Sequence, residues 1–174
     1  GSGVLAFRKP MQWQPYAFGG GQEFGLRSGT VAVPQAVALA KAARMAVETM
    51  DERSENYRNW QQQLRAALAH FGDIVHIISA PECAAHILSF SVRDIKGEVL
   101  INALQKHGVI VSTSSACSSK QTKTSHVVEA LNIDEHFKKG VVRVSFGAHV
   151  TSDDIAQLIQ VINTVLKELK GERL

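Results

Sequence analysis

The fold class is decided by Lys96-Gly-Glu-Val-Leu-Ile-Asn-Ala-Leu-Gln-Lys-His-Gly-Val-Ile-Val111. This stretch passes from a helical pattern directly into a strand pattern. Gly108 is the residue type that commonly follows a helix C-terminus. The β-branched residues 109–111 then suit a buried strand. The helix expected over 96–107 is amphipathic, and its apolar face consists of Val99, Leu100, Ala103 and Leu104.

Short elements of both kinds surround this stretch. Residues 75–78, 86–92 and 141–146 have strand composition, and Ala80-Pro81-Glu82 predicts a turn between the first two. Helices are expected over 125–131 and from Thr151 or Ser152 to about 169, the second with two aspartates in its first turn. The predicted fold class is α/β, with a small mixed sheet covered by helices.

The first part of the chain is organised differently. Val4–Phe7 predicts a short strand, and the residues from 19 to 29 are rich in glycine. Pro34 then suits the first turn of a helix whose pattern continues to about His70. Unbroken, that helix would be about 54 Å long at roughly 1.5 Å per residue. We therefore expect a kink near 51–55 or a passage between two domains.

Bulk composition excludes several classes of protein. The 174 residues are 45% hydrophobic and 20% charged, which is typical of a globular domain. The net charge of +3 is dispersed, so nucleic-acid binding is not expected. No membrane span or signal peptide is expected either. Two cysteines favour a reduced, cytoplasmic setting, and the seven scattered histidines predict no metal site.

The segment Val111-Ser-Thr-Ser-Ser-Ala-Cys-Ser-Ser119 places one thiol among hydroxyl side chains after the expected strand. We expect Cys117 to lie on an exposed loop, because these polar residues cannot continue a core. Reactive thiols are exposed with polar neighbours, whereas inert thiols are buried. The residues alone leave both interpretations of Cys117 open.

Two further segments have the composition of binding sites. Gly19-Gly-Gly-Gln-Glu-Phe-Gly-Leu-Arg-Ser-Gly-Thr30 combines glycines with the donors Arg27, Ser28 and Thr30 just before a helix, which suits an anion. The alternative is a flexible connector. In Arg143-Val-Ser-Phe-Gly147, an arginine lies on a strand expected to be mostly buried, so it requires a negative partner. The alternative is a solvated or structurally paired arginine on an edge strand.

These three motifs, in this order, resemble the C-terminal portion of the NifS/IscS-type cysteine desulfurases, which are class V aminotransferases of pyridoxal phosphate (PLP) fold-type I. The resemblance covers almost the whole chain. It implies that residues 1–32 are a remnant of the large PLP-binding domain and that residues 33–174 form the small C-terminal domain. Departures occur at Phe24, Thr113-Ser114 and Ala148-His149.

The resemblance also implies roles for three residues. Cys117 would attack the sulfur of a cysteine–PLP adduct and become a persulfide, leaving alanine. Arg143 would bind the substrate carboxylate, and Thr30 would reach the PLP phosphate of the partner subunit in a homodimer. The sulfur acceptor would be an iron–sulfur scaffold or a tRNA-thiolation relay, and the sequence does not choose between them.

The resemblance places the PLP-binding lysine upstream of Gly1, and Lys9 matches no Schiff-base position. We therefore expect the chain alone to be inactive as a PLP enzyme. Two other hypotheses remain open at this point: a persulfide carrier or interaction module that uses Cys117 without PLP, and a structural fragment without activity.

Overall fold

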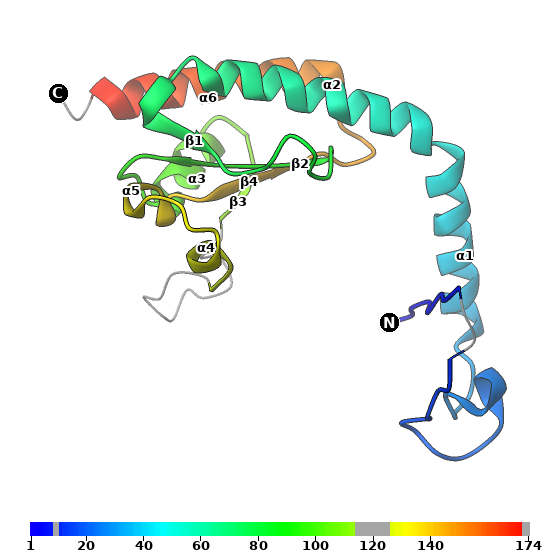
Figure 1. Ribbon diagram of the computed structural model, residues 1–174. Helices are drawn as coiled ribbons and strands as arrows, with labels where there is room; N and C mark the ends of the chain where they lie inside the picture. The colour runs from blue at the N-terminus through cyan, green and yellow to red at the C-terminus, as the bar shows by residue number, and fades with distance from the viewer. Residues whose placement is uncertain (9–10, 114–125, 172–174) are drawn as a thin grey trace. The chain divides into compact units, whose positions relative to one another are not determined.

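The computed structural model describes residues 1–8, 11–113 and 126–171 (Figure 1). Packing divides the chain into two compact units, Gly1–Met50 and Asp51–Leu174, which are described separately. The predicted division into 1–32 and 33–174 differs from this one and stays a prediction.

The first unit contains the Gly-rich segment and helix α1 (Val33–Glu48). Pro34 occupies the first turn of α1, as predicted. The expected strand over Val4–Phe7 is wrong, because no described strand pairs with these residues and their large apolar side chains are exposed. A strand requires a partner for its backbone groups.

The predicted long helix is interrupted at Thr49, between α1 and α2 (Met50–Ala69). The break lies just before the expected region 51–55. The Thr49 hydroxyl donates a hydrogen bond to the Met45 carbonyl at 3.0 Å. Such a bond back to the preceding turn competes with helix continuation. The two helices differ in environment, since α1 has no buried residue whereas α2 buries the aromatic and leucine residues of one face.

A four-stranded sheet forms the centre of the second unit, with the order β1-β2-β4-β3. The strands are β1 (Val75–Ile77), β2 (Ile87–Val92), β3 (Ser112–Thr113) and β4 (Val142–Ser145). All pairings between them are antiparallel. The fold class is therefore confirmed, but the expectation of a mixed sheet is wrong. Because β4 lies between β2 and β3, it is a central strand.

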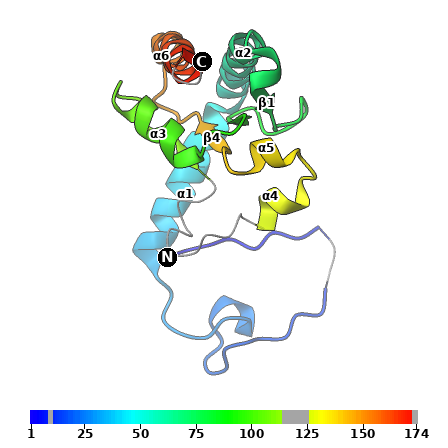
Figure 2. The same cartoon turned by 90° about the vertical axis from the view of Figure 1, so that its left-hand side faces the viewer.

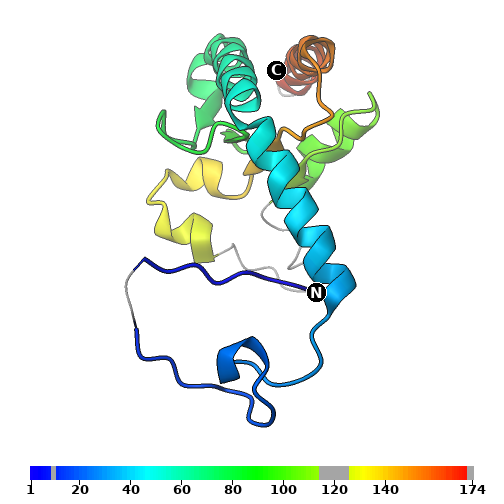
Figure 3. The same cartoon turned by 90° about the vertical axis from the view of Figure 1, so that its right-hand side faces the viewer.

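Helices cover one face of this sheet. Figures 2 and 3 show α2 and α6 (Ser152–Gly171) side by side on that face, and α3 (Gly97–Gln105) packs against α6, β3 and β4. Strand burial alternates along β4. The core combines Leu88, Phe90, Val142 and Val144 of the sheet with residues of these helices, among them Trp60, Leu64, Leu68, Leu100, Leu104, Ile155, Ile162 and Leu166.

Helix α3 ends as its sequence predicts. Gly108 has a φ of 78° and donates to the Gln105 carbonyl at 2.9 Å, while Val109 donates to the Leu104 carbonyl at 3.2 Å. This pair of bonds is a Schellman motif. The helix buries Leu100 and Leu104, but Val99 is 46% exposed, so the predicted apolar face is too wide.

The strand that follows α3 lies later than predicted. The ladder residues are Ser112 and Thr113, and Ile110 is 85% exposed. The expectation that Ser112–Ser119 contributes nothing to the interior is wrong at Thr113, which is 7% exposed and donates to the Val141 carbonyl at 2.9 Å. Backbone pairing with β4 and this hydroxyl bond outweigh the β-branched pattern of 109–111.

Three other small elements lie in the described part of the second unit: the 3-10 helix η2 (Gly72–Ile74), α4 (His126–Ala130) and α5 (Glu135–Lys138). Helix α4 agrees with the prediction over 125–131. Helix α5 was not predicted, because four residues are too few to show a helical period. Thr151 and Asp154 form reciprocal hydrogen bonds at the start of α6, which confirms the predicted helix opening.

Candidate functional site

The site residue Arg143 lies on the sheet face that the long helices do not cover. It occupies β4 between Val142 and Val144, which point into the core. Ser89 of β2 and Ser112 of β3 are its direct cross-strand partners. Arg143 is exposed, so the prediction of a buried guanidinium is wrong. The alternative is correct in that Arg143 is solvated, but its edge position is wrong because β4 is central.

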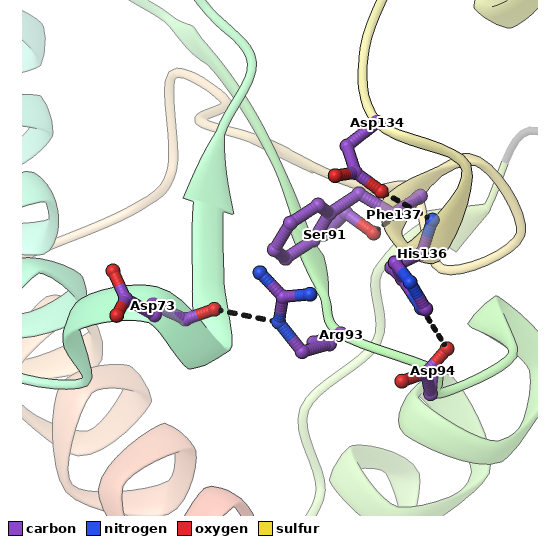
Figure 4. Close-up of polar contacts among 7 residues, drawn as sticks. All are labelled: Asp73, Ser91, Arg93, Asp94, Asp134, His136 and Phe137. Carbon is purple, nitrogen blue, oxygen red and sulfur yellow. Dashed lines mark hydrogen bonds and ion pairs between the residues drawn. The ribbon is translucent and has the colours of Figure 1, made fainter.

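Helix α5 packs on the β1–β2 end of the sheet face that carries Arg143 (Figure 4). The Ser91 hydroxyl donates to the Phe137 carbonyl at 2.5 Å, and the ring centroids of His76 and Phe137 are 5.3 Å apart. His76 and Ser91 are cross-strand partners on the same face as Ser89. The guanidinium of Arg93 lies 4.8 Å from the Phe137 ring centroid and its Nε donates to the Asp73 carbonyl. Helix α5 therefore covers the β1–β2 end, whereas Arg143 and Ser112 at the other end are exposed.

An ion pair fixes α5 to the turn between β2 and α3. His136 Nδ1 lies 2.8 Å from an Asp94 oxygen, and the Asp94 amide donates to the His136 carbonyl. The hydrogen bond with Asp94 and the charges of Asp94 and Asp134 raise the pKa of His136 above its ordinary value of 6.5. Both side chains of the pair are about half exposed, so solvent screens the interaction.

This pair predicts a small pH dependence of stability. Because the folded-state pKa of His136 is raised, its contribution is fully present below about pH 6.5 and is lost as the pH rises through the raised pKa. Replacing Asp94 with Asn should lower the pKa of His136 in an NMR titration. The same variant should reduce the denaturation midpoint at pH 5.5 more than at pH 8.5. An equal reduction at both values would assign the effect to other contacts of Asp94.

Cys117 lies outside the described residues, so its predicted loop position stays a prediction. The described elements on each side are both fixed to the second unit. Thr113 is held by its hydroxyl bond to Val141. Lys138 of α5 forms ion pairs with Glu135 and with Glu129 of α4, the second at 3.1 Å.

The Gly-rich segment has a defined local structure of its own. Glu23 and Phe24 both adopt positive φ, at 52° and 59°, and Gly25 continues this left-handed turn. The Ser28 hydroxyl lies 3.1 Å from the Ala17 carbonyl oxygen and 3.0 Å from that of Gly20. The anion-binding donors expected here are thus partly used within the segment.

Arg27 likewise donates to the Ser28 carbonyl. Thr30 differs, because it is exposed and its hydroxyl has no hydrogen bond to any residue that the structure describes. It lies two residues before Ala32, the N-cap of α1. Of the three donors predicted in this segment, Thr30 is therefore the one whose side chain forms no hydrogen bond to a described residue.

Cys83 occupies a different environment, which the sequence did not reveal. Gln61 is 6% exposed and donates from Nε2 to the Ile87 carbonyl at 2.9 Å, with its amide 3.5 Å from the Cys83 sulfur. Arg65 donates to the carbonyls of Ser79 and Ala80 at 2.8 Å. These contacts fix the connection between β1 and β2, and they give Cys83 a structural setting.

Within the described ranges, no three His, Cys, Asp or Glu side chains are grouped so that they could hold a metal ion. None of the helices there is long and apolar enough to span a membrane.

Comparisons with known proteins agree with the architecture. The chain is 30% identical over 174 residues to a protein named cysteine desulfurase of Sinorhizobium fredii and 33% identical to a cysteine desulfurase IscS of Ehrlichia chaffeensis. These matches include 99% and 98% of this chain, but only 45% and 42% of the relatives. The chain thus spans less than half the length of either.

Solved structures show the same relation. A NifS-like protein superposes with a TM-score of 0.76 at 32% identity, over 92% of this chain and 40% of the other. The cysteine desulfurase CsdA of Escherichia coli, at 16% identity and a TM-score of 0.64, shares the fold. The family profile described as aminotransferase class-V matches residues 1–158. The chain therefore belongs to the class-V aminotransferase family.

Proposed function

We propose that the chain is the small-domain portion of a cysteine desulfurase, which converts L-cysteine to L-alanine and transfers the sulfur to an acceptor. The observation that carries the proposal is the position of Arg143. It lies on a central strand, on the sheet face opposite α2 and α6, and its side chain forms no hydrogen bond or ion pair with any described residue. A guanidinium presented in this way suits bidentate binding of a carboxylate.

The implied cofactor is PLP, and the described residues fit one part of it. The exposed Thr30 hydroxyl, in a glycine-rich turn before a helix, suits an oxygen of the PLP phosphate. In the described part of the first unit the single lysine is Lys41, which lies on α1. When bound, PLP would supply an electron sink that weakens the carbon–sulfur bond of the substrate.

The residues of this chain would then act on the two ends of L-cysteine. Arg143 would hold the carboxylate, which orients the amino acid. The Cys117 thiolate would attack the substrate sulfur, so that a sulfur–sulfur bond forms while the carbon–sulfur bond breaks. The substrate carbon would retain the electron pair and gain a proton, which gives alanine. Cys117 would then carry the sulfur as a persulfide.

The proposed partners follow from this chemistry. A persulfide must be passed to an acceptor, such as a scaffold for iron–sulfur clusters or a component of tRNA thiolation. A homodimer would bring Thr30 to the phosphate of the partner subunit. The mechanism also requires Cys117 as a free thiol, which a reducing compartment such as the cytoplasm provides.

The test is alanine formation from L-cysteine by the full-length, cofactor-loaded protein. The proposal expects turnover and one transferable sulfur on Cys117. A persulfide carrier would accept sulfur from a donor but would form no alanine from cysteine. Absence of both reactions would contradict the proposal and would favour a structural role.

Replacing Arg143 with Lys should reduce kcat/KM for L-cysteine about tenfold to hundredfold. An ammonium cannot supply the forked pair of hydrogen bonds, and a charge-assisted hydrogen bond contributes about 1.5–3 kcal/mol. Steady-state kinetics and thermal unfolding should be measured on the same variant.

Arg58→Lys provides the matched control, because Arg58 is an exposed arginine on α2. Kinetic constants of Arg143→Lys equal to those of this control, in a folded protein, would remove Arg143 from the substrate site.

A further inference from the structure

Ser89, Arg143 and Ser112 are neighbours on adjacent strands of the sheet face opposite α2 and α6. We call these three residues the serine–arginine row. The strand register places Ser89 of β2 on one side of Arg143 and Ser112 of β3 on the other. Directly opposed residues of antiparallel strands point to the same face, with Cβ atoms about 4.5–5.5 Å apart. The Arg143 side chain therefore leaves the sheet between two serine side chains.

Neither cross-strand neighbour of Arg143 is an acidic residue that could pair with its charge. An opposite charge at a cross-strand position contributes about 0.2–1 kcal/mol, so Asp or Glu would stabilise the sheet at either flank. Both flanks carry serine instead. In the described ranges, the side chains of all three residues have no hydrogen bond or ion pair. No side chain in the described part of the chain therefore neutralises the charge of Arg143.

Ser89 and Ser91 lie on the same strand and face but differ in whether the hydroxyl is hydrogen-bonded, which supports a ligand-binding role for Ser89. Ser91 lies two residues after Ser89 on the same strand and face, and its hydroxyl is fully used by the Phe137 carbonyl of α5. Helix α5 therefore covers and satisfies one serine of β2, whereas the next serine, beside Arg143, is left with its donor available.

We propose that the serine–arginine row is one carboxylate-binding unit, in which Ser89 and Ser112 each donate a hydrogen bond to the carboxylate that Arg143 binds. A carboxylate has about four acceptor positions, and a bidentate guanidinium uses two of them. The two hydroxyls satisfy the remaining pair from either side. This inference rests on the proposed function, and it adds two binding residues to the same site.

The sharpest test is Ser89→Asp in the full-length, cofactor-loaded protein. The new carboxylate pairs with Arg143 and repels the substrate, so KM for L-cysteine should rise about tenfold or more, with a smaller change in kcat. Ser89→Ala should raise KM less, and Ser89→Thr, which retains the hydroxyl, should stay close to the unchanged protein. Ser112→Asp repeats the test from β3 if Ser89→Asp fails to fold.

The matched control is Gln62→Glu, which adds the same charge on an exposed position of α2 and keeps the side-chain shape. If KM values of the Ser89 and Ser112 variants equal that of this control, the row is not a binding unit and the inference is overturned.

A binding experiment separates this inference from the proposed function. Acetate can be titrated into the same protein while the Arg143 Nε–H signal is followed by NMR. Acetate binding that Ser89→Ala weakens and Ser89→Thr retains supports the row even if the protein forms no alanine, in which case the proposed function alone fails. Turnover together with acetate binding unaffected by Ser89→Ala and Ser112→Ala overturns the row and leaves the proposed function standing.

Discussion

Replacing Cys117 with Ser should reduce alanine formation from L-cysteine by at least about a hundredfold in the full-length, cofactor-loaded protein. A neutral hydroxyl is a far weaker nucleophile than a thiolate, and it cannot form the persulfide on which the proposed sulfur transfer depends. Removing the nucleophile of an enzyme commonly costs several orders of magnitude in rate. Initial rates of alanine release, measured with and without an added thiol reductant, give the size of the effect.

Cys83→Ser is the control for this experiment. The Cys83 sulfur lies 3.5 Å from the Gln61 amide and 3.9 Å from Arg65, and a serine oxygen can accept similar hydrogen bonds. Turnover should therefore be retained in Cys83→Ser. If Cys117→Ser kept the rate of the unchanged protein, sulfur would not pass through Cys117 and the proposed mechanism would be wrong.

Replacing Gly140 with Ala should lower the free energy of unfolding by about 3 kcal/mol or more, which is the upper part of the range for overpacking. A Cβ atom there would lie 2.4 Å from the Ile95 carbonyl oxygen and 2.9 Å from that of Val92. Both are backbone atoms, so neither can rotate away as a flexible side chain would. Gly140 lies two residues before β4, which begins at the buried Val142, so the substitution would disturb the strand that carries Arg143.

Gly108→Ala is the comparison that separates steric from conformational cost. Gly108 has a φ of 78° and open space around its Cα, so alanine there is strained only through its backbone, by about 1–2 kcal/mol. Denaturant unfolding of both variants should show Gly140→Ala as clearly the less stable. A smaller loss at Gly140 would mean that the turn before β4 can relax.

The fold class could be predicted because several elements carry strong local signals. The apolar period of 96–107 specifies a helix. Local hydrogen bonds then set helix boundaries, at Gly108 for the end of α3 and at Thr151 and Asp154 for the start of α6. The direction of strand pairing could not be predicted in this way, since it depends on contacts between distant segments. The same limit explains why the apolar pattern predicts a strand at 109–111, whereas β3 lies at Ser112–Thr113.

The candidate site was predictable by residue type but not by arrangement. The family resemblance implies a carboxylate-binding role for Arg143, whereas its exposure follows from the position of β4 and from the limited reach of α5. Ser89 and Ser91 alternate with apolar residues in β2, which indicates an outward face. Only the register shows that Ser89, and not Ser91, is beside Arg143.

The buried Gln61 and the close approach at Gly140 had no distinctive sequence signal. A glutamine on a helix usually faces water, but Gln61 is buried. Only glycine fits at position 140, because the carbonyl oxygens of Ile95 and Val92 lie too close for a Cβ atom. Such features depend on the packing of one element against another. They show how the Arg143 strand and the β1–β2 connection are fixed.

The most direct measurement of the central claim is the intact and peptide mass of the full-length, cofactor-loaded protein after one turnover with L-cysteine in the absence of reductant. The proposed function predicts one additional sulfur atom on the peptide that contains Cys117, none on the peptide that contains Cys83, and one alanine released for each sulfur bound. Alanine release with no sulfur on Cys117, or sulfur located on Cys83, would contradict it.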